Sequence, residues 1–174
     1  KKYILENIGF FIILGITSIT IFNSIVYYSL YYTQVISGIL MISTIPVWII
    51  FISSILNIEK TNIFQIIGVI FSLTGVIFII TKADLNLIKS LDFNKGDLSM
   101  VVAMFSWAVY SALLKSKKYE ISQFALLQVV IITGLIFLIP IYFIEMYLGH
   151  LIVLGKPFIL TLTYVVLFPG LAAF

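Results

Sequence analysis

Residues 7–58, NIGFFIILGITSITIFNSIVYYSLYYTQVISGILMISTIPVWIIFISSILNI, decide the fold, because no Asp, Glu, Lys or Arg interrupts them. A bilayer core of about 30 Å needs about 20 helical residues for each crossing. This stretch is more than twice that long, so it predicts two membrane crossings joined by a tight turn. The turn is expected near Tyr31–Gln34, where aromatic rings and a polar amide suit the membrane interface.

Further charge-free stretches follow at 61–81, 98–114, 121–144 and 157–174. A barrel strand would alternate apolar and polar residues, and runs such as GVIFII at 75–80 do not. The sequence therefore predicts an all-α fold, a polytopic membrane helix bundle. Its six transmembrane helices are expected at 7–30, 33–56, 61–81, 97–115, 121–145 and 157–174.

The composition excludes several classes of protein. Hydrophobic residues make up 62% of the chain and charged residues 10%, against a charged share of about 25% in soluble domains. An ordinary cytosolic enzyme, a disordered tail and a nucleic-acid-binding module are thereby excluded. The chain has no Cys and one His, which rules out Cys/His metal clusters and Cys–His catalysis. We expect no catalytic residue, cofactor or metal. We also expect most of the chain to be surrounded by the lipid bilayer.

Local signals mark where the helices begin and bend. Thr61 or Asn62, Asp97 and Ser122 are predicted N-caps, and Pro157 fits a first turn. Pro46 lies in the middle of the second span and predicts a kink, since proline has no N–H and its ring displaces an earlier carbonyl. The kink suits either a substrate contact with bending, or packing without a role in binding.

Lysines and the chain start give two further expectations. Six of the ten lysines fall on the side of Lys1 and Lys2, a weak bias that places this side in the cytoplasm. The chain begins with Lys and its last residues are apolar, so we expect it to be an internal piece of a longer protein.

Each predicted helix carries a stripe of small or polar residues at helical spacing. Such stripes either pack helices closely or line a polar cavity. For the third helix, with Gly68 and Gly75, close packing is favoured. In the first, second and fourth helices the stripes also carry Tyr, Trp and Asn, and both interpretations stay open. Tyrosines at 27–32 also fit an interface belt. The stripes of these three helices contain Thr17, Thr20, Ser24, Tyr28 and Tyr31; Thr33, Ser37, Thr44 and Trp48; and Ser99, Ala103, Ser106 and Tyr110.

An ordered set of motifs resembles a known family. The segment from Leu30 contains LYYTQVISGIL, the mid-membrane Pro46, LNIE ending at Glu59, and two glycines seven residues apart, Gly68 and Gly75. A second set follows, with Gly96-Asp97-Leu98 and the motif WAVY at 107–110. In this order the motifs resemble the drug/metabolite transporter superfamily, specifically the EamA-type ten-helix permeases.

The resemblance implies two inverted five-helix repeats, with this chain similar to helices three to eight. Residues 1–81 would form the C-terminal three helices of the first repeat, and 97–174 the N-terminal three helices of the second. Residues 82–96 would form the external loop between the two repeats. The resemblance also implies a multi-pass permease or exporter of small organic metabolites, such as amino-acid-like solutes, in the cell inner (plasma) membrane. Transport would proceed by alternating access, and the six helices alone are not expected to transport.

The resemblance assigns site residues by position. Substrate binding would fall to Ser24, Tyr28, Ser37, Pro46, Trp107 and Tyr110, and structural roles to Glu59, Gly68, Gly75 and Asp97. The partners expected are a small-molecule substrate and lipid, with a homodimer left open and no nucleic acid. A membrane-embedded enzyme and a structural membrane subunit remain the alternative functions. An enzyme would need converging Asp, His or Ser side chains near one interface, and the chain offers only Asp84, Asp92 and Asp97 in one loop and His150 in another.

Overall fold

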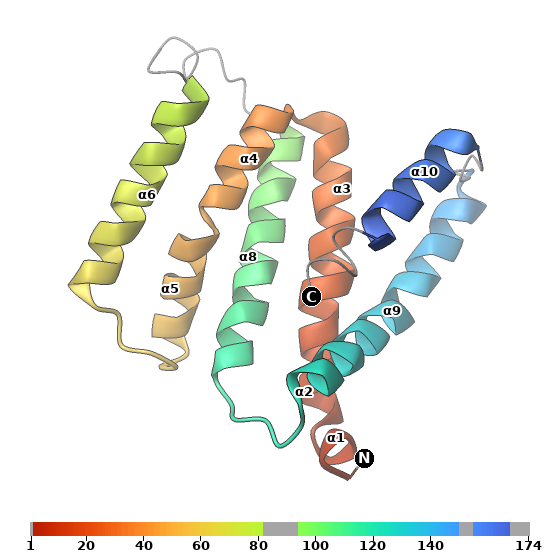
Figure 1. The fold of residues 1–174 in the computed structure, drawn as a ribbon, viewed down its shortest axis with the longest axis horizontal. Helices are drawn as coiled ribbons and strands as arrows, with labels where there is room; N and C mark the ends of the chain where they lie inside the picture. Colours follow the sequence, from red (N-terminus) through yellow and green to blue (C-terminus); the bar gives the residue numbers. More distant parts are fainter. Residues whose placement is uncertain (1, 82–93, 150–154, 168–174) are drawn as a thin grey trace. The chain divides into compact units, whose positions relative to one another are not determined.

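A computed structural model describes residues 2–81, 94–149 and 155–167, which are helical apart from short connections (Figure 1). The chain forms two compact units, Lys1–Leu138 and Ile139–Phe174, and the second holds the end of α9 and all of α10. The helices are α1 (Lys2–Glu6), α2 (Ile8–Gly15), the π-helix η1 (Ile16–Ile21), α3 (Phe22–Tyr32), α4 (Val35–Ser43), α5 (Ile45–Ile55), α6 (Ile63–Thr81), α8 (Lys95–Lys115), α9 (Gln123–Tyr147) and α10 (Lys156–Val165).

Four helical stretches of the described chain are long and apolar enough to cross a membrane: Ile8–Tyr32, Val35–Ile55, Lys95–Lys115 and Gln123–Tyr147. Helix α6 adds a shorter apolar stretch, Ile63–Phe78. Large apolar side chains face outward, as they do in a protein surrounded by lipid. The predicted class, an all-α polytopic membrane bundle, is confirmed. Helices α6 and α10 fall on the predicted third and sixth spans, and 168–174 lie outside the described residues.

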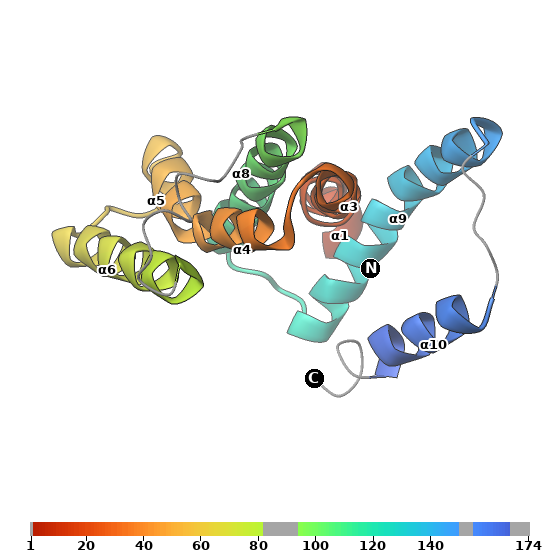
Figure 2. The same cartoon turned by 90° about the horizontal axis from the view of Figure 1, so that it is seen from above.

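Helix α8 is the centre of the first unit. It packs against α3 on one side and against α4 and α5 on the other, and α6 contacts α4 (Figures 1 and 2). Met100, Ala103 and Met104 of α8 are fully buried. Around them pack Phe22, Ile25 and Val26 of the first long helix, with Met41, Ile45 and Trp48 of α4 and α5.

The start of the first long helix crosses α9 at two glycines. A Cβ atom added to Gly15 would lie 2.3 Å from the Thr133 hydroxyl oxygen, and one added to Gly134 would lie 2.4 Å from the Ile19 Cβ. The Thr20 hydroxyl donates to the Gly134 carbonyl at 2.9 Å, and the Thr133 hydroxyl lies 3.1 Å from the Phe11 carbonyl. Here small residues permit close approach and hydroxyls join the helices.

Two interruptions divide the first two spans. The second span breaks at Thr44, with Pro46 in the first turn of α5, which agrees with the predicted kink. The Ser43 and Thr44 hydroxyls each donate to a carbonyl of the preceding turn at 2.6 Å. The π-helix η1 was not predicted from the sequence. It is followed by Asn23, whose amide donates to the carbonyls of Ser18 and Ile19 at 3.1 Å each.

Most predicted helix ends are confirmed. The turn between the first two spans lies at Thr33–Gln34. The predicted caps also form: the Asn62 side chain accepts a bond from the Phe64 N–H at 3.2 Å, and the Ser122 hydroxyl accepts one from the Ala125 N–H at 3.3 Å. Pro157 lies in the first turn of α10.

The prediction that Asp97 is the N-cap of α8 is wrong. Asn94 caps α8, because its side chain accepts bonds from the N–H groups of Gly96 and Asp97, and the helix therefore begins at Lys95. Asp97 is the third helical residue and completes a capping box by accepting from the Asn94 N–H.

Candidate functional site

Three of the four predicted substrate residues on the first and fourth spans pack against other aromatic side chains. Tyr28 is 51% exposed, and its ring centroid lies 5.0 Å from that of Tyr32. Trp107 packs against Phe22 and Tyr110, with centroid distances of 4.6 and 5.2 Å. Tyr110 also packs against the buried cluster around Phe11, Leu14 and Val130. Ser24 is half-buried on α3.

The remaining two predicted substrate residues lie on α4 and α5. Ser37 is buried, and Pro46 is exposed at the start of α5. Pro46 alone among the six lines the cavity described next. The assignment of these six side chains to a substrate path stays a prediction.

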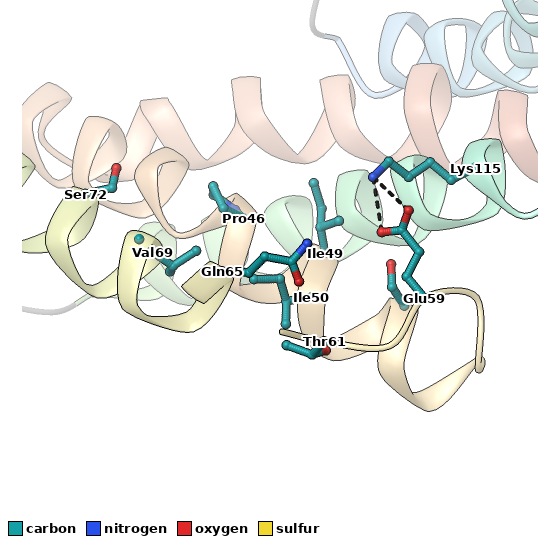
Figure 3. Close-up of a pocket in the computed structure, with 11 residues that line it drawn as sticks. Pro46, Ile49, Ile50, Glu59, Thr61, Gln65, Val69, Ser72 and Lys115 are labelled. Atoms are coloured by element: carbon teal, nitrogen blue, oxygen red, sulfur yellow. Dashed lines mark hydrogen bonds and ion pairs between the residues drawn. The ribbon is translucent and has the colours of Figure 1, made fainter. Parts of the chain in front are cut away.

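A cavity of about 380 Å³ lies between α5 and α6, and we call it the α5–α6 groove. One end is formed by the α5–α6 connection and the last residue of α8, and the walls come from the two helices (Figure 3). Its size falls within the range of small-molecule sites, about 300–1,000 Å³. The groove is lined by Pro46, Ile49, Ile50, Ser53, Glu59, Thr61, Gln65, Gly68, Val69, Ser72 and Lys115.

An ion pair forms the charged end of the groove. Lys115 Nζ lies 3.2 Å from Glu59 Oε2 and 3.3 Å from Oε1, and the two side chains are 58% and 49% exposed. Figure 3 shows the lysine amine pointing at the carboxylate. The pair ties the α5–α6 connection to the end of α8, and the structural role expected for Glu59 stays a prediction.

The backbone places Glu59 by ending α5 sharply. Asn57 adopts a φ of 52°, the left-handed conformation that asparagine tolerates. The Ile58 N–H donates to the Ser53 carbonyl at 2.9 Å and the Asn57 N–H to the Ser54 carbonyl at 3.1 Å. This pair of bonds is a Schellman motif, which closes a helix and reverses the chain.

Ser53 is the unusual residue of the groove. It is 3% exposed, and its hydroxyl has no hydrogen-bond partner among the residues that the structure describes. A buried polar group left without a partner costs about 1–3 kcal/mol. Ser53 is also one of the residues that line the groove.

Gln65 lies on the opposite wall. Its Oε1 accepts a bond from the Asn62 N–H at 3.0 Å, which fixes the side chain at the start of α6. Figure 3 shows it extending from α6 towards α5. The groove thus has hydrogen-bonding groups on both helices near its charged end.

At the other end of α8 the polar groups satisfy one another. Asp97 is 2% exposed. Its carboxylate accepts bonds from the Thr33 hydroxyl and, at 2.8 Å, from the Asn94 N–H. A Cβ atom on Gly96 would lie 2.8 Å from the Ser29 carbonyl oxygen. This cluster joins the turn between α3 and α4 to the start of α8.

Ser53 and Lys115 line the groove but were not predicted as site residues from the sequence. Pro46, Ile49 or Ile50, and Ser53 follow one another at three- to four-residue spacing on α5, so they share one face. That spacing would have pointed to Ser53 once Pro46 was chosen. Nothing in the local sequence brings Lys115 to Glu59. Gly68 lines the groove, and neither it nor Gly75 has a described atom within 4 Å of an added Cβ, so their predicted structural role remains a prediction.

Comparisons with known proteins agree with the family resemblance. Residues 1–81 match the EamA-like transporter family. Over 113 residues the chain is 29% identical to the "Uncharacterized transporter YyaM" of Bacillus subtilis (strain 168), which covers 65% of this chain and 37% of that protein. The chain therefore spans a little over a third of the curated relative. No solved structure gives a significant match.

Proposed function

From the match of residues 1–81 to EamA-like transporters, we propose that the protein carrying this chain is a permease or exporter of small organic metabolites. Amino-acid-like solutes are the proposed substrates. The bundle of apolar helices places the chain in a membrane, and we propose the cell inner (plasma) membrane. The family match is the observation that carries the proposal, and no enzymatic step is part of it.

Two structural features support transport by alternating access. The π-helix η1 and the break at Thr44 interrupt the hydrogen-bond ladders of the first two spans. Local departures of this kind are common at functional sites, and irregular helices in transporters surround the substrate path. Bending at Thr44 would move α5, and with it one wall of the α5–α6 groove.

The test uses the whole protein reconstituted in vesicles, with radiolabelled amino acids as the probes. We expect faster uptake than in empty vesicles, and slower uptake after Trp107→Ala and Ser37→Leu. Phe71→Ala, on an exposed ring of α6, is the control and should leave the rate unchanged. Equal uptake rates in vesicles with and without the protein would reject amino acids as substrates. Unchanged rates in both variants would remove Trp107 and Ser37 from the path.

The proposed orientation has its own test. This chain contains no cysteine, so Lys117→Cys in a cysteine-free version of the whole protein creates a single site. Its position after α8 is proposed to be cytoplasmic. An impermeant thiol reagent should label it in opened cells and not in intact ones, and labelling in intact cells would invert the topology.

A further inference from the structure

The polarity of the α5–α6 groove changes in order along its length. Glu59 and Lys115 lie at the end of the spans, outside α5 and at the last residue of α8. Ser53 and Gln65 follow within the last turn of α5 and the first turn of α6. Deeper in the groove the walls are mainly apolar, with Ile49, Ile50 and Val69, and Ser72 lies at the far end. Charge, then neutral hydrogen bonding, then hydrocarbon is also the order of headgroup, glycerol esters and acyl chain in a phospholipid.

The charges at the groove's end fit a headgroup that carries both signs. Glu59 and Lys115 neutralise each other, and both side chains are about half exposed, so a ligand can reach either. An anionic headgroup would meet the Glu59 carboxylate. In an ethanolamine phosphate the ammonium and the phosphate are joined by two carbons, so the ammonium can donate to Glu59 while the phosphate accepts from Lys115.

The uncharged part of the groove fits the rest of such a molecule. The Ser53 hydroxyl is buried in the last turn of α5 without a partner among the described residues, and Ser53 lines the groove. On the facing wall, an added Cβ on Gly68 would meet no described atom within 4 Å. The space beside Gly68 is therefore open on the groove side, and the proposal places the acyl chain there.

We propose that the α5–α6 groove is a binding site for a phospholipid with an ethanolamine headgroup. Glu59 and Lys115 hold the headgroup, Ser53 donates to an ester carbonyl, and the acyl chain lies against Gly68 and the isoleucines of α5. The proposal does not depend on transport, because lipid retention is measured without any solute.

The experiment is native mass spectrometry of the whole protein in detergent, with added phosphatidylethanolamine, phosphatidylcholine or phosphatidylglycerol of identical acyl chains. We expect the ethanolamine lipid to be retained best. The choline headgroup cannot donate a hydrogen bond to Glu59, and the glycerol headgroup lacks the cation. Equal retention of all three lipids would overturn the proposal.

Two matched pairs of variants test the uncharged contacts. Ser53→Ala should weaken retention about fivefold, the equivalent of one hydrogen bond, whereas Ser54→Ala, at the exposed neighbouring serine, should not. Gly68→Leu should fill the open space beside this residue and abolish retention. Gly75→Leu, one heptad along the same helix and outside the groove lining, should have no effect. If both members of a pair behave alike, the lipid does not bind here.

Removing the negative charge of Glu59 should create a new lipid preference. Glu59→Gln leaves Lys115 as an unpaired cation, so the preference should change from the ethanolamine to the glycerol headgroup. Glu120→Gln removes an exposed carboxylate outside the groove and should leave the preference unchanged. Glycerophosphoethanolamine, which lacks acyl chains, should not displace the lipid. Displacement by it at equal concentration would show that the groove takes a soluble zwitterion, and would overturn the lipid assignment.

Discussion

The two ends of α8 carry similar polar residues, but these residues differ in burial and in their hydrogen-bond partners. At the Asp97 end, defined by Ser29, Thr33, Asn94, Gly96 and Asp97, the carboxylate is buried and accepts bonds from a hydroxyl and an N–H. At the Lys115 end, defined by Ser53, Glu59, Gln65 and Lys115, the carboxylate is half exposed and the buried hydroxyl has no described partner.

The difference separates a buried polar network from the site that we propose to bind a ligand. Buried polar groups that satisfy one another fix the packing of their helices. Groups that line a cavity without being satisfied leave bonds for a ligand. The presence of Asp, Glu, Ser or Thr therefore says little, and their partners in the fold decide what they do.

The largest expected effect breaks the Asp97 end. Asp97→Ala removes part of the capping box and leaves the Thr33 hydroxyl and the Asn94 N–H without their acceptor. We expect the free energy of unfolding to fall by about 3 kcal/mol. Thermal unfolding of the purified protein in detergent, followed by circular dichroism, measures the loss. Glu120→Ala, at an exposed carboxylate, should leave the midpoint unchanged. Equal midpoints for the two variants would show that the buried network adds no stability.

The second prediction compares two glycines. Gly96→Ala places a Cβ atom 2.8 Å from the Ser29 carbonyl and 2.9 Å from the Thr33 nitrogen, both backbone atoms. The turn must move, and we expect a loss of about 1–3 kcal/mol. Gly68→Ala meets no described atom within 4 Å and should stabilise α6 by about 0.5–1 kcal/mol, because alanine favours a helix. The same unfolding experiment gives both values, and changes of the same sign would contradict the comparison.

The third effect is smaller and lies at the Lys115 end. Lys115→Gln breaks an ion pair whose side chains are 58% and 49% exposed. Exposed pairs contribute about 0–1 kcal/mol, so the unfolding midpoint should change little. We expect the midpoints of Lys115→Gln and wild type to converge further at high salt, which screens exposed charges. A loss as large as that of Asp97→Ala would mean that the two ends are equivalent.

The smallest effect concerns Tyr119, which follows the Lys115 end and donates its hydroxyl to the Leu114 carbonyl at 3.0 Å. Burial raises the pKa of Tyr119 to about 12, and the charges of Tyr3 and Tyr110 add to the rise. Between the unfolded pKa of about 10 and the folded value, the folded state binds more protons. This contribution to stability is complete below pH 10 and is lost as the pH rises through about 12.

Absorbance titration at alkaline pH measures this group. Tyr119→Phe should remove the latest phenolate transition and flatten the fall in stability above pH 10. An unchanged titration curve would assign the late transition to another tyrosine.

Much of the fold could be predicted because it depends on local chemistry. The charge-free run at 7–58 predicted two spans and a turn, which the structure has at Thr33–Gln34. The caps at Asn62 and Ser122 could be identified because a cap bonds to an N–H within three residues. Pro46 predicted the interruption for the same reason, since its effect is confined to one turn.

The rest depends on contacts between segments far apart in the sequence. The carboxylates of Glu59 and Asp97 look alike in the sequence, and only their partners Lys115 and Thr33 distinguish an exposed pair from a buried network. Ser53 was passed over because an unpartnered hydroxyl is defined by what surrounds it. Asp97 was misassigned as a cap because asparagine favours the cap position about as strongly as aspartate, and Asn94, three residues earlier, takes it.

The π-helix at Ile16–Ile21 has a consequence for the whole first span. A π turn holds one more residue than an α turn, and each residue turns an α-helix by about 100°. Phe11, Leu14 and Gly15 before it meet α9, while Phe22, Ile25 and Val26 after it meet α8. The extra residue thus sets the phase between two halves of one rod. Deleting a single residue from 16–21 would rotate one half of the helix relative to the other by about 100° and turn its contact residues away from their neighbouring helix.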